Sequence, residues 1–169
     1  MQTFLPWDDF FDSAGTLDRL RLGKQRVEAM QILNALEGSQ PHRFPTSIEL
    51  FGPQIGWVNH PAVLMWKNYE HALCLYGIEV CNEWTSRGYK DGVRNRFLEF
   101  LEKHYTSSVQ PVPMPPWLGR EEFHESHRAA LVAKDHEHYS ELFPGTAGKL
   151  NYWWPTEHGF NPESGQFDG

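Results

Sequence analysis

Apolar residues recur at helical spacing along most of the chain, and this pattern predicts an all-α protein. The first predicted helix begins after Thr16 or Asp18, either of which can cap it, and it ends at Glu37-Gly38. One stripe of this helix is apolar and is expected to face the core: Leu22, Ala29, Leu33 and Leu36. No segment alternates polar and apolar residues over a length that would predict a strand.

A second, longer helix is predicted from His60-Pro61 to Gly88, because proline is favoured in the first helical turn and glycine after the last. Asp91 caps a shorter helix that extends to about residue 105, and two more helices are expected at about 120–133 and 136–143. The sequence therefore predicts about four to five helices.

The remaining segments are irregular and connect or flank these helices. An N-terminal segment covers about residues 1–15, a connection rich in proline and glycine covers 38–59, and a stiff extended segment covers 110–117. The polar tail, about residues 156–169, is expected to fray. At 169 residues the chain is most simply one domain, 1–169.

Composition supports a folded core and limits the classes of function. Hydrophobic residues make up 40% of the chain and aromatic residues 14%, which is enough to fill a core without disulfides. The formal net charge of −7 argues against a protein that coats nucleic acid through bulk electrostatics. It leaves open an enzyme that contacts a few phosphates through a local cationic patch.

Cysteine usage predicts a cytoplasmic protein. Cys74 and Cys81 are seven residues apart in a predicted helix, which puts them on one face but about 10 Å apart along its axis. That separation is too large for a disulfide, so both are expected to be buried, reduced thiols. We find neither a secretory signal nor an apolar run of membrane-spanning length, so no membrane partner is expected.

The first helix concentrates charge: residues 17–33 hold four cations and two carboxylates. Arg21, Lys24, Gln25 and Glu28 lie three or four residues apart and share one face. In the functional interpretation, Arg21, Lys24 and Arg26 contact phosphates. Glu28 is then the acid/base or electrostatic group among them. The alternative is a solvated helix face with weak ion pairs.

A second polar cluster lies near residues 124–134. His124 and His127 are spaced i,i+3, and Arg128 follows His124 at i,i+4, so the three can face one way. A metal site would need a third ligand that no spacing supplies, and we expect neither a metal nor another cofactor. An anion pocket made by His127, Arg128 and Lys134 is favoured over a metal site, and ordinary surface polarity is the alternative.

Two further features allow both a structural and a functional interpretation. Asn59 and His60 lie where a loop enters a helix, where side chains either contact ligands or cap the helix. Several aromatic residues either stack on nucleobases or fill the core: Trp57, Trp117, Tyr152, Trp153 and Trp154. The chain lacks a phosphate-binding glycine loop, a Cys-x-x-Cys pair and a nucleophile elbow. Most nucleoside triphosphatases, zinc ribbons and serine hydrolases are thereby excluded.

Short segments spread over most of the chain carry a family resemblance. They are Leu17-Asp18 with Leu22, Arg26-Val27-Glu28-Ala29, Gly56-Trp57 with Asn59-His60-Pro61, Glu83 with Arg87-Gly88-Tyr89, and His127-Arg128 with Leu131, Lys134 and Tyr139. In these segments the chain resembles the pyrimidine-dimer DNA glycosylases, the endonuclease V-like helical enzymes. It resembles more closely a branch of small bacterial and phage proteins that begin Met-Gln-Thr-Phe-Leu-Pro and close with an aromatic-Trp-Pro tail.

The resemblance implies an all-α, metal-free glycosylase and AP lyase whose partner is damaged or modified DNA. In that family the amino-terminal amine attacks the sugar of the damaged nucleotide and a glutamate of the first helix assists. The resulting imine then permits strand cleavage. Glu28 stands where that glutamate is expected, and Arg21 and Arg26 stand near the family's phosphate-binding arginines. A neutral fraction of the amine is available because an α-amine titrates at about pH 8.

The chain departs from the family pattern at two positions. Gln2 replaces a small residue, and its bulk disfavours removal of Met1; the nucleophile is then the amine of Met1, unless processing exposes Gln2 or Thr3. Val27 replaces an arginine before the glutamate.

Two other classes of function therefore remain open. One is a non-catalytic module that binds nucleic acid or a nucleotide-like ligand through Arg21, Lys24, Arg26 and Arg128. The other is an enzyme on a small phosphorylated metabolite that uses the cluster of His124, His127 and Arg128. The sequence carries no signal for an oligomeric state.

Overall fold

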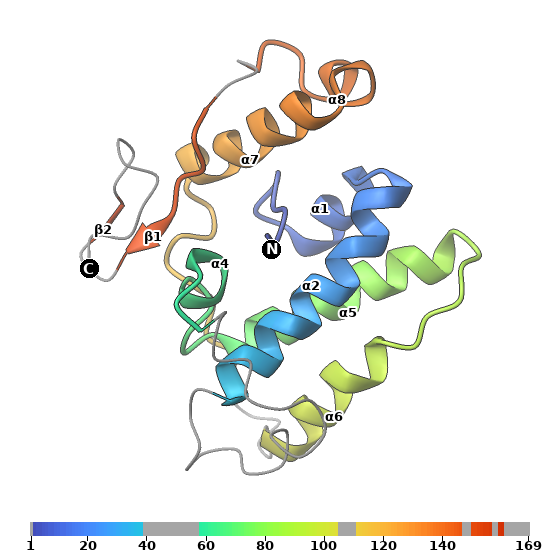
Figure 1. Cartoon of the computed structure of the whole chain (residues 1–169), viewed down its shortest axis with the longest axis vertical. Helices are drawn as coiled ribbons and strands as arrows, with labels where there is room; N and C mark the ends of the chain where they lie inside the picture. The colour runs from blue at the N-terminus through green and yellow to red at the C-terminus, as the bar shows by residue number, and fades with distance from the viewer. Residues whose placement is uncertain (1, 39–57, 105–110, 147–149, 157–158, 161–169) are drawn as a thin grey trace.

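The computed structural model describes residues 2–38, 58–104, 111–146, 150–156 and 159–160, and these segments are mainly helical (Figure 1). The helices are α1 (Phe10–Thr16), α2 (Arg19–Gly38), α4 (Pro61–Leu64), α5 (Glu70–Ser86), α6 (Arg94–His104), α7 (Glu121–Lys134) and α8 (His136–Leu142). Two strands of two residues each, β1 (Pro155–Thr156) and β2 (Gly159–Phe160), pair antiparallel. The predicted all-α class is confirmed.

The described segments hold seven helices, more than the four to five expected, for two reasons. First, α1 lies inside the segment expected to be irregular, where Asp9 caps it by accepting the N–H of Asp12 at 2.9 Å. Second, the helix expected over 60–88 is two helices, α4 and α5, with Asn68 between them at a φ of 71°. A residue in that left-handed conformation interrupts a right-handed helix, and asparagine tolerates it better than most residues.

The predicted helix starts are confirmed at two aspartates. Oδ1 of Asp18 accepts the N–H groups of Leu20 and Arg21 at 2.8 and 3.1 Å, at the start of α2. Oδ2 of Asp91 accepts the N–H of Arg94 at 2.8 Å, at the start of α6. Each carboxylate satisfies backbone donors that have no partner within the helix.

Helix α5 lies at the centre of the fold, where α1, α2 and α6 pack against it (Figure 1). Gly77 of α5 meets the ring of Phe97 of α6 so closely that a Cβ atom at position 77 would overlap the ring. At Gly23 of α2, a Cβ atom would lie 3.1 Å from the ring of Trp84 of α5. Glycine at position 77 is therefore needed for the close crossing of α5 and α6, whereas a side chain at position 23 would require a small shift of Trp84.

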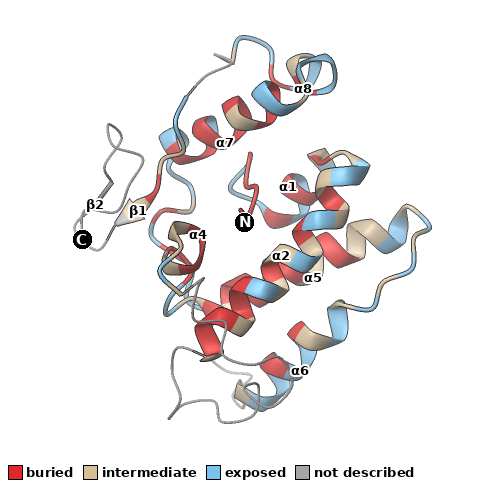
Figure 2. Cartoon of the chain, viewed as in Figure 1, coloured by how far each residue is buried: buried red, intermediate tan, exposed pale blue. Residues whose placement is uncertain are grey.

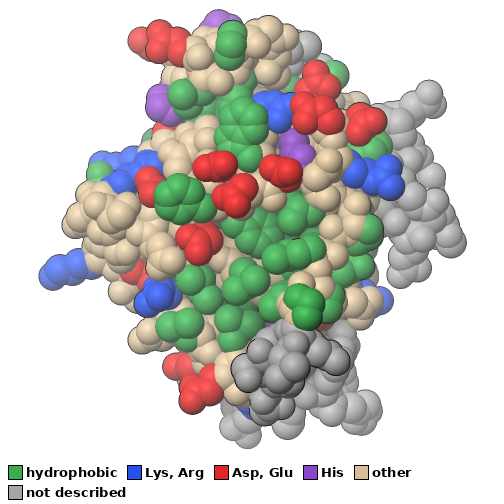
Figure 3. All heavy atoms as spheres, turned by 180° about the vertical axis from the view of Figure 1, so that it is seen from behind, with side chains coloured by type: hydrophobic (Ala, Val, Ile, Leu, Met, Phe, Trp, Pro, Cys, Tyr) green, Lys and Arg blue, Asp and Glu red, His purple; other side chains and the backbone are tan. Residues whose placement is uncertain are grey.

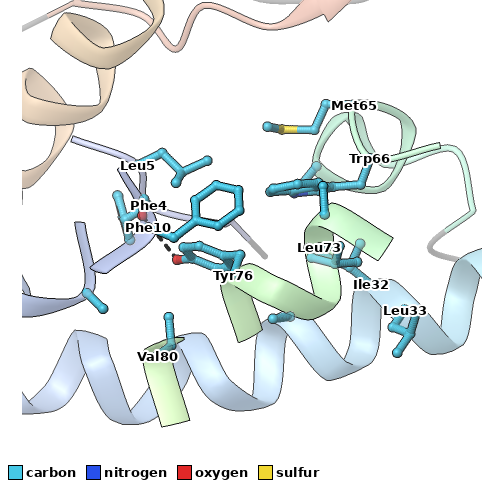
Figure 4. Close-up of a cluster of buried hydrophobic side chains, with 14 of the residues drawn as sticks. Phe4, Leu5, Phe10, Ile32, Leu33, Met65, Trp66, Leu73, Tyr76 and Val80 are labelled. Carbon is cyan, nitrogen blue, oxygen red and sulfur yellow. Dashed lines mark hydrogen bonds between the residues drawn. The ribbon is translucent and has the colours of Figure 1, made fainter. Parts of the chain in front are cut away.

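The first residues of the chain run into the core rather than over its surface. Thr3 and Leu5 are 0% exposed and Phe4 is 5% exposed, and Figure 2 shows this segment as buried. In Figure 4, Phe4 and Leu5 lie among the aromatic side chains of the core, and the Tyr76 hydroxyl lies within hydrogen-bond distance of the Phe4 carbonyl, at 3.0 Å. We call residues 2–6 the N-terminal arm.

Cys74 and Cys81 are buried free thiols, as predicted. Burial raises the pKa of both thiols, to about 12 for Cys81, so neither is a thiolate near neutral pH. Among the described residues, no helix has the length and hydropathy of a membrane span. The same residues contain no group of three or more His, Cys, Asp or Glu side chains that could hold a metal ion.

Candidate active site

The Glu28 carboxylate is hydrogen-bonded to Gln2, the second residue of the chain. Its Oε2 atom accepts the backbone N–H of Gln2 at 3.1 Å and the side-chain N–H of Gln25 at 3.1 Å. The Met1 candidate lies outside the described residues, but its neighbour Gln2 contacts the carboxylate. Thr3, the last of the terminal candidates, is fully buried.

A pocket of about 460 Å³ opens beside this carboxylate, and we call it the Glu28 pocket. Two cations of α2 and one from the end of α7 line it: Arg21, Lys24 and Lys134. The other lining residues are Gln2, Phe4, Leu20, Gln25, Glu28 and Tyr152. The fold thus brings Glu28 together with three of the cations predicted to contact phosphate.

The two lysines of the pocket form no ion pair with a described carboxylate. Lys24 and Lys134 are both exposed, and neither has an ion-pair partner among the described residues. An exposed ammonium group without a carboxylate partner can bind an anion without first breaking an ion pair.

Arg21, by contrast, is held by neighbouring carboxylates. Its guanidinium lies 2.5 Å from Asp18 and 3.5 Å from Asp135, and 5.4 Å from the ring centroid of Tyr139. Burial alone would raise the pKa of Asp18, but hydrogen bonds from Arg21 and Tyr139 outweigh burial and lower it to about 2. Asp18 therefore stays ionised over most of the pH range and fixes Arg21 at the edge of the pocket.

Arg26 lines a second hollow on α2, which we call the outer groove, and does not line the Glu28 pocket. Its guanidinium pairs with Asp91 and lies 4.3 Å from the ring centroid of Trp84. The groove has a volume of about 560 Å³ and is lined by Arg19, Leu20, Gly23, Lys24, Arg26, Val27, Glu28, Gln31 and Trp84. The predicted phosphate contact of Arg26 would have to compete with Asp91.

The polar cluster of α7 binds the N-terminal arm by its backbone. Nδ1 of His127 accepts the N–H of Leu5 at 3.1 Å, and Nδ1 of His124 lies 2.8 Å from the Leu5 carbonyl. Arg128 donates to the Pro6 carbonyl at 2.8 Å. All three side chains are buried, and each satisfies a backbone group of the arm, although Nε2 of His127 is buried without a hydrogen-bond partner among the described residues.

The structure therefore does not assemble the predicted anion pocket of His127, Arg128 and Lys134. Burial, with a smaller contribution from neighbouring His124, lowers the pKa of His127 to about 3, so its ring is neutral near neutral pH. Arg128 pairs with Glu121, whereas Lys134 lines the Glu28 pocket. His124 and His127 are turned to the arm and buried, whereas Arg128 also lines a separate pocket of about 300 Å³ beside Trp7 and Phe143.

His60 caps α4, as one of its two interpretations predicted. Its Nδ1 accepts the N–H of Ala62 at 3.1 Å. Burial lowers the pKa of His60, and the charge of Glu28 acts in the opposite direction, so the imidazole lies within the electrostatic influence of that carboxylate. Asn59 is exposed beside it.

Of the aromatic residues that were candidates for stacking on nucleobases, some lie in the core and one lines the Glu28 pocket. Trp117 and Trp154 are 3% and 8% exposed and belong to the core, and Trp153 packs against it. Tyr152 lines the Glu28 pocket, and burial raises its pKa to about 12. Trp57 lies outside the described residues.

By helical spacing Gln25 lies on the helix face of Glu28, but the sequence pattern assigns no function to its side chain. It falls in the buried stripe of α2, between Leu22 and Ala29, and is 1% exposed. A polar side chain in an apolar stripe is the signal that could have identified it, because a buried amide requires hydrogen-bond partners.

Comparison with known proteins gives one family match. A family model described as pyrimidine dimer DNA glycosylase matches residues 1–96, which include α1, α2, α4 and α5. No curated protein and no solved structure matches the chain.

Proposed function

The chain belongs to the pyrimidine dimer DNA glycosylase family, and on that premise we propose that it is a DNA glycosylase and AP lyase acting on a damaged or modified base. The amine at the start of the chain is the proposed nucleophile, and Glu28 is the assisting carboxylate. The observation that carries this proposal is the 3.1 Å hydrogen bond from the Gln2 N–H to Glu28, at the edge of a cationic pocket.

The proposed reaction begins with the neutral amine, since the ordinary pKa of an α-amine is about 8 and leaves a neutral fraction near neutral pH. The amine lone pair attacks C1′ of the deoxyribose, and the bond from C1′ to the base breaks. The base leaves with the bonding electrons and takes up a proton. The sugar ring then opens between C1′ and its ring oxygen, which is protonated, and the nitrogen forms an imine with C1′. In all, the nitrogen loses two protons, which balance the one taken up by the base and the one taken up by the ring oxygen.

Strand cleavage follows by elimination. A proton leaves C2′, the bond from C3′ to oxygen breaks, and the electrons leave on the 3′ phosphate. Water then hydrolyses the imine and restores the amine. Glu28 is proposed to stabilise the cationic C1′ centre and to accept the C2′ proton, two tasks suited to an ionised carboxylate.

The distribution of charge supports a substrate held through few phosphates. The net charge is −7, yet Arg21, Lys24 and Lys134 surround Glu28. The face seen in Figure 3 gathers acidic side chains beside hydrophobic ones, which disfavours a polyanion there. DNA is therefore expected to approach along α2 and the end of α7.

Borohydride trapping on an abasic duplex tests the proposal, because borohydride reduces an imine to a stable covalent adduct. We expect the wild-type protein to form the adduct and Glu28→Gln to form it at least about 10²-fold more slowly, with unchanged thermal unfolding. Glu102→Gln changes an exposed glutamate of α6 and is the matched control, expected to keep the wild-type rate.

Mass spectrometry of the digested adduct identifies the residue that carries the DNA. Attachment to the first residue of the chain is expected: Met1 if it is retained, or Gln2 if Met1 is removed. Attachment to a lysine would overturn the amine assignment. No adduct with any abasic substrate would overturn the lyase proposal. Salt-dependent DNA binding that is equal in the wild type and in Glu28→Gln would then identify a non-catalytic binding module.

A further inference from the structure

The Gln25 side chain joins the N-terminal arm, Glu28 and the core through one amide group. Its Nε2 atom donates to the Gln2 carbonyl at 2.8 Å and to Glu28 at 3.1 Å. Its Oε1 atom accepts the Phe4 N–H at 2.8 Å and the Tyr76 hydroxyl at 2.7 Å. Both amide hydrogens and the amide oxygen are therefore used inside the protein.

Only one orientation of this amide suits its surroundings. If the nitrogen and oxygen were exchanged, the NH₂ group would face the Phe4 N–H, and the oxygen would face the Gln2 carbonyl and the Glu28 carboxylate. Like groups would then oppose each other at the Phe4, Gln2 and Glu28 contacts, whereas the Tyr76 hydroxyl could serve either orientation. In the observed orientation the amide pairs with residues 2 and 4 of the arm much as a neighbouring β-strand would, with one donor and one acceptor.

Tyr76 supports the amide from the interior. Its side chain is 0% exposed, and its hydroxyl lies 2.7 Å from Gln25 and 3.0 Å from the Phe4 carbonyl. Burial raises the pKa of Tyr76 well above its usual value, so the hydroxyl keeps its proton and remains a donor.

We propose that Gln25 is a positioning residue whose amide sets the distance between the start of the chain and the Glu28 carboxylate. This inference rests on the proposed function, in which those two groups react with the substrate. Gln25 is 1% exposed and acts through Gln2 and Glu28. Its contribution is to hold the amine and the carboxylate together before DNA arrives, so that neither has to be ordered during the reaction.

Gln25→Met removes the four hydrogen bonds and keeps a side chain of similar length. The trapping rate of the folded variant is expected to fall about 10²-fold, because small displacements of reacting groups are costly. Equilibrium affinity for abasic DNA is expected to stay within about threefold, since Gln25 is buried. Tyr76→Phe removes the supporting hydroxyl but keeps the ring, and is expected to slow trapping by a smaller factor.

Gln25→Glu distinguishes positioning from packing through the pH profile. The introduced carboxylate would face Glu28, and the two negative charges would repel each other near neutral pH. At lower pH the pair can share one proton, which restores a donor between them. The ratio of variant to wild-type trapping rate should therefore rise as the pH falls from about 8 to about 5.5. Asn95→Asp, on the exposed side of α6, is the matched control and should show a constant ratio.

Amide hydrogen exchange provides a readout that does not need activity. The Phe4 N–H donates to Gln25 in the wild type, so its exchange is expected to be at least about tenfold faster in Gln25→Met. If the wild type forms no adduct, the proposed function is overturned. Hydrogen exchange of the Phe4 amide then remains the test of whether Gln25 positions the arm. Equal trapping rates in wild type and folded Gln25→Met, or unchanged protection of Phe4, would overturn that role.

Discussion

The two ends of the N-terminal arm are held by different helices in different ways. At residues 2–4, α2 supplies Gln25 and Glu28, next to a pocket that carries two exposed lysines. At residues 5–6, α7 supplies two histidines and an arginine that are all buried. One end of the arm borders an open pocket, and the other is enclosed.

The sequence patterns of the two helices are similar, since both place cations and proton-binding groups at helical spacing. The structural difference comes from what each cluster faces. The α7 cluster meets the donors and acceptors of the arm backbone, and these hydrogen bonds offset part of its desolvation. The α2 cluster meets the backbone on one side and solvent on the other, so the ammonium group of Lys24 stays hydrated. Residue spacing alone indicates a polar face, not whether that face is covered.

The largest effect on stability is expected at the enclosed end. Arg128→Met leaves the Pro6 carbonyl without its donor and removes the pairing with Glu121, so it should lower the free energy of unfolding by about 2–4 kcal/mol. Lys134→Met, in the last turn of the same helix, should change it by less than about 0.5 kcal/mol. Urea unfolding measures both. Equal losses in the two variants would mean that the two regions do not differ as described.

The pH dependence of stability should also originate at the enclosed end. The pKa of His127 is about 3 in the folded protein against 6.5 for an unperturbed histidine, so below pH 6.5 the unfolded chain binds more protons. The free energy of unfolding should therefore decrease by about 2 kcal/mol between about pH 7 and pH 5. His127→Gln offers an acceptor to Leu5 but does not titrate, and it should flatten this decrease. An unchanged pH profile in His127→Gln would assign the dependence to another group.

At the open end, substitution of the pocket lysines should weaken DNA binding and leave the free energy of unfolding unchanged. Lys24→Gln and Lys134→Gln should each reduce the slope of log affinity for DNA against log salt by about 1. Neither should shift the urea midpoint beyond error, because both side chains are exposed and unpaired among the described residues. Lys67→Gln changes an exposed lysine outside the Glu28 pocket and serves as the control. If Lys67→Gln lowered the salt slope by the same amount, the pocket lysines would not be specific DNA contacts.

A moderate loss of stability, smaller than that of Arg128→Met, is expected where α8 meets the start of α2. The Tyr139 hydroxyl donates to Asp18 at 2.6 Å and accepts the Asp18 N–H at 3.0 Å. Tyr139→Phe removes both bonds and should cost about 1 kcal/mol of stability at neutral pH, measured by urea unfolding. Salt-dependent DNA binding should be retained. A loss above that of Arg128→Met would reverse the expected order.

Features that depend on neighbouring residues could be predicted from the sequence. Asp18 and Asp91 cap helices because their partners lie within three residues. Lys24 and Glu28 share a helix face because they are one turn apart. The all-α class follows from the same periodicity.

Features that depend on distant partners could not be predicted in this way. His127 and Leu5 are 122 residues apart, and Gln25 and Tyr76 are 51 residues apart, so no local spacing encodes either contact. Lys134 was grouped with Arg128, but six residues correspond to about 240° of helix rotation beyond one full turn. That rotation separates the two side chains, one holding the arm and the other lining the Glu28 pocket.

The burial of residues 5–6 under α7 also constrains the order of assembly. The ribosome makes the arm first, yet its histidine and arginine partners are translated more than a hundred residues later. The arm therefore cannot reach its native place co-translationally until nearly the whole of α7 has left the exit tunnel. A nascent chain halted before that point lacks the α7 contacts of Leu5 and Pro6, although α2 can already supply Gln25 and Glu28.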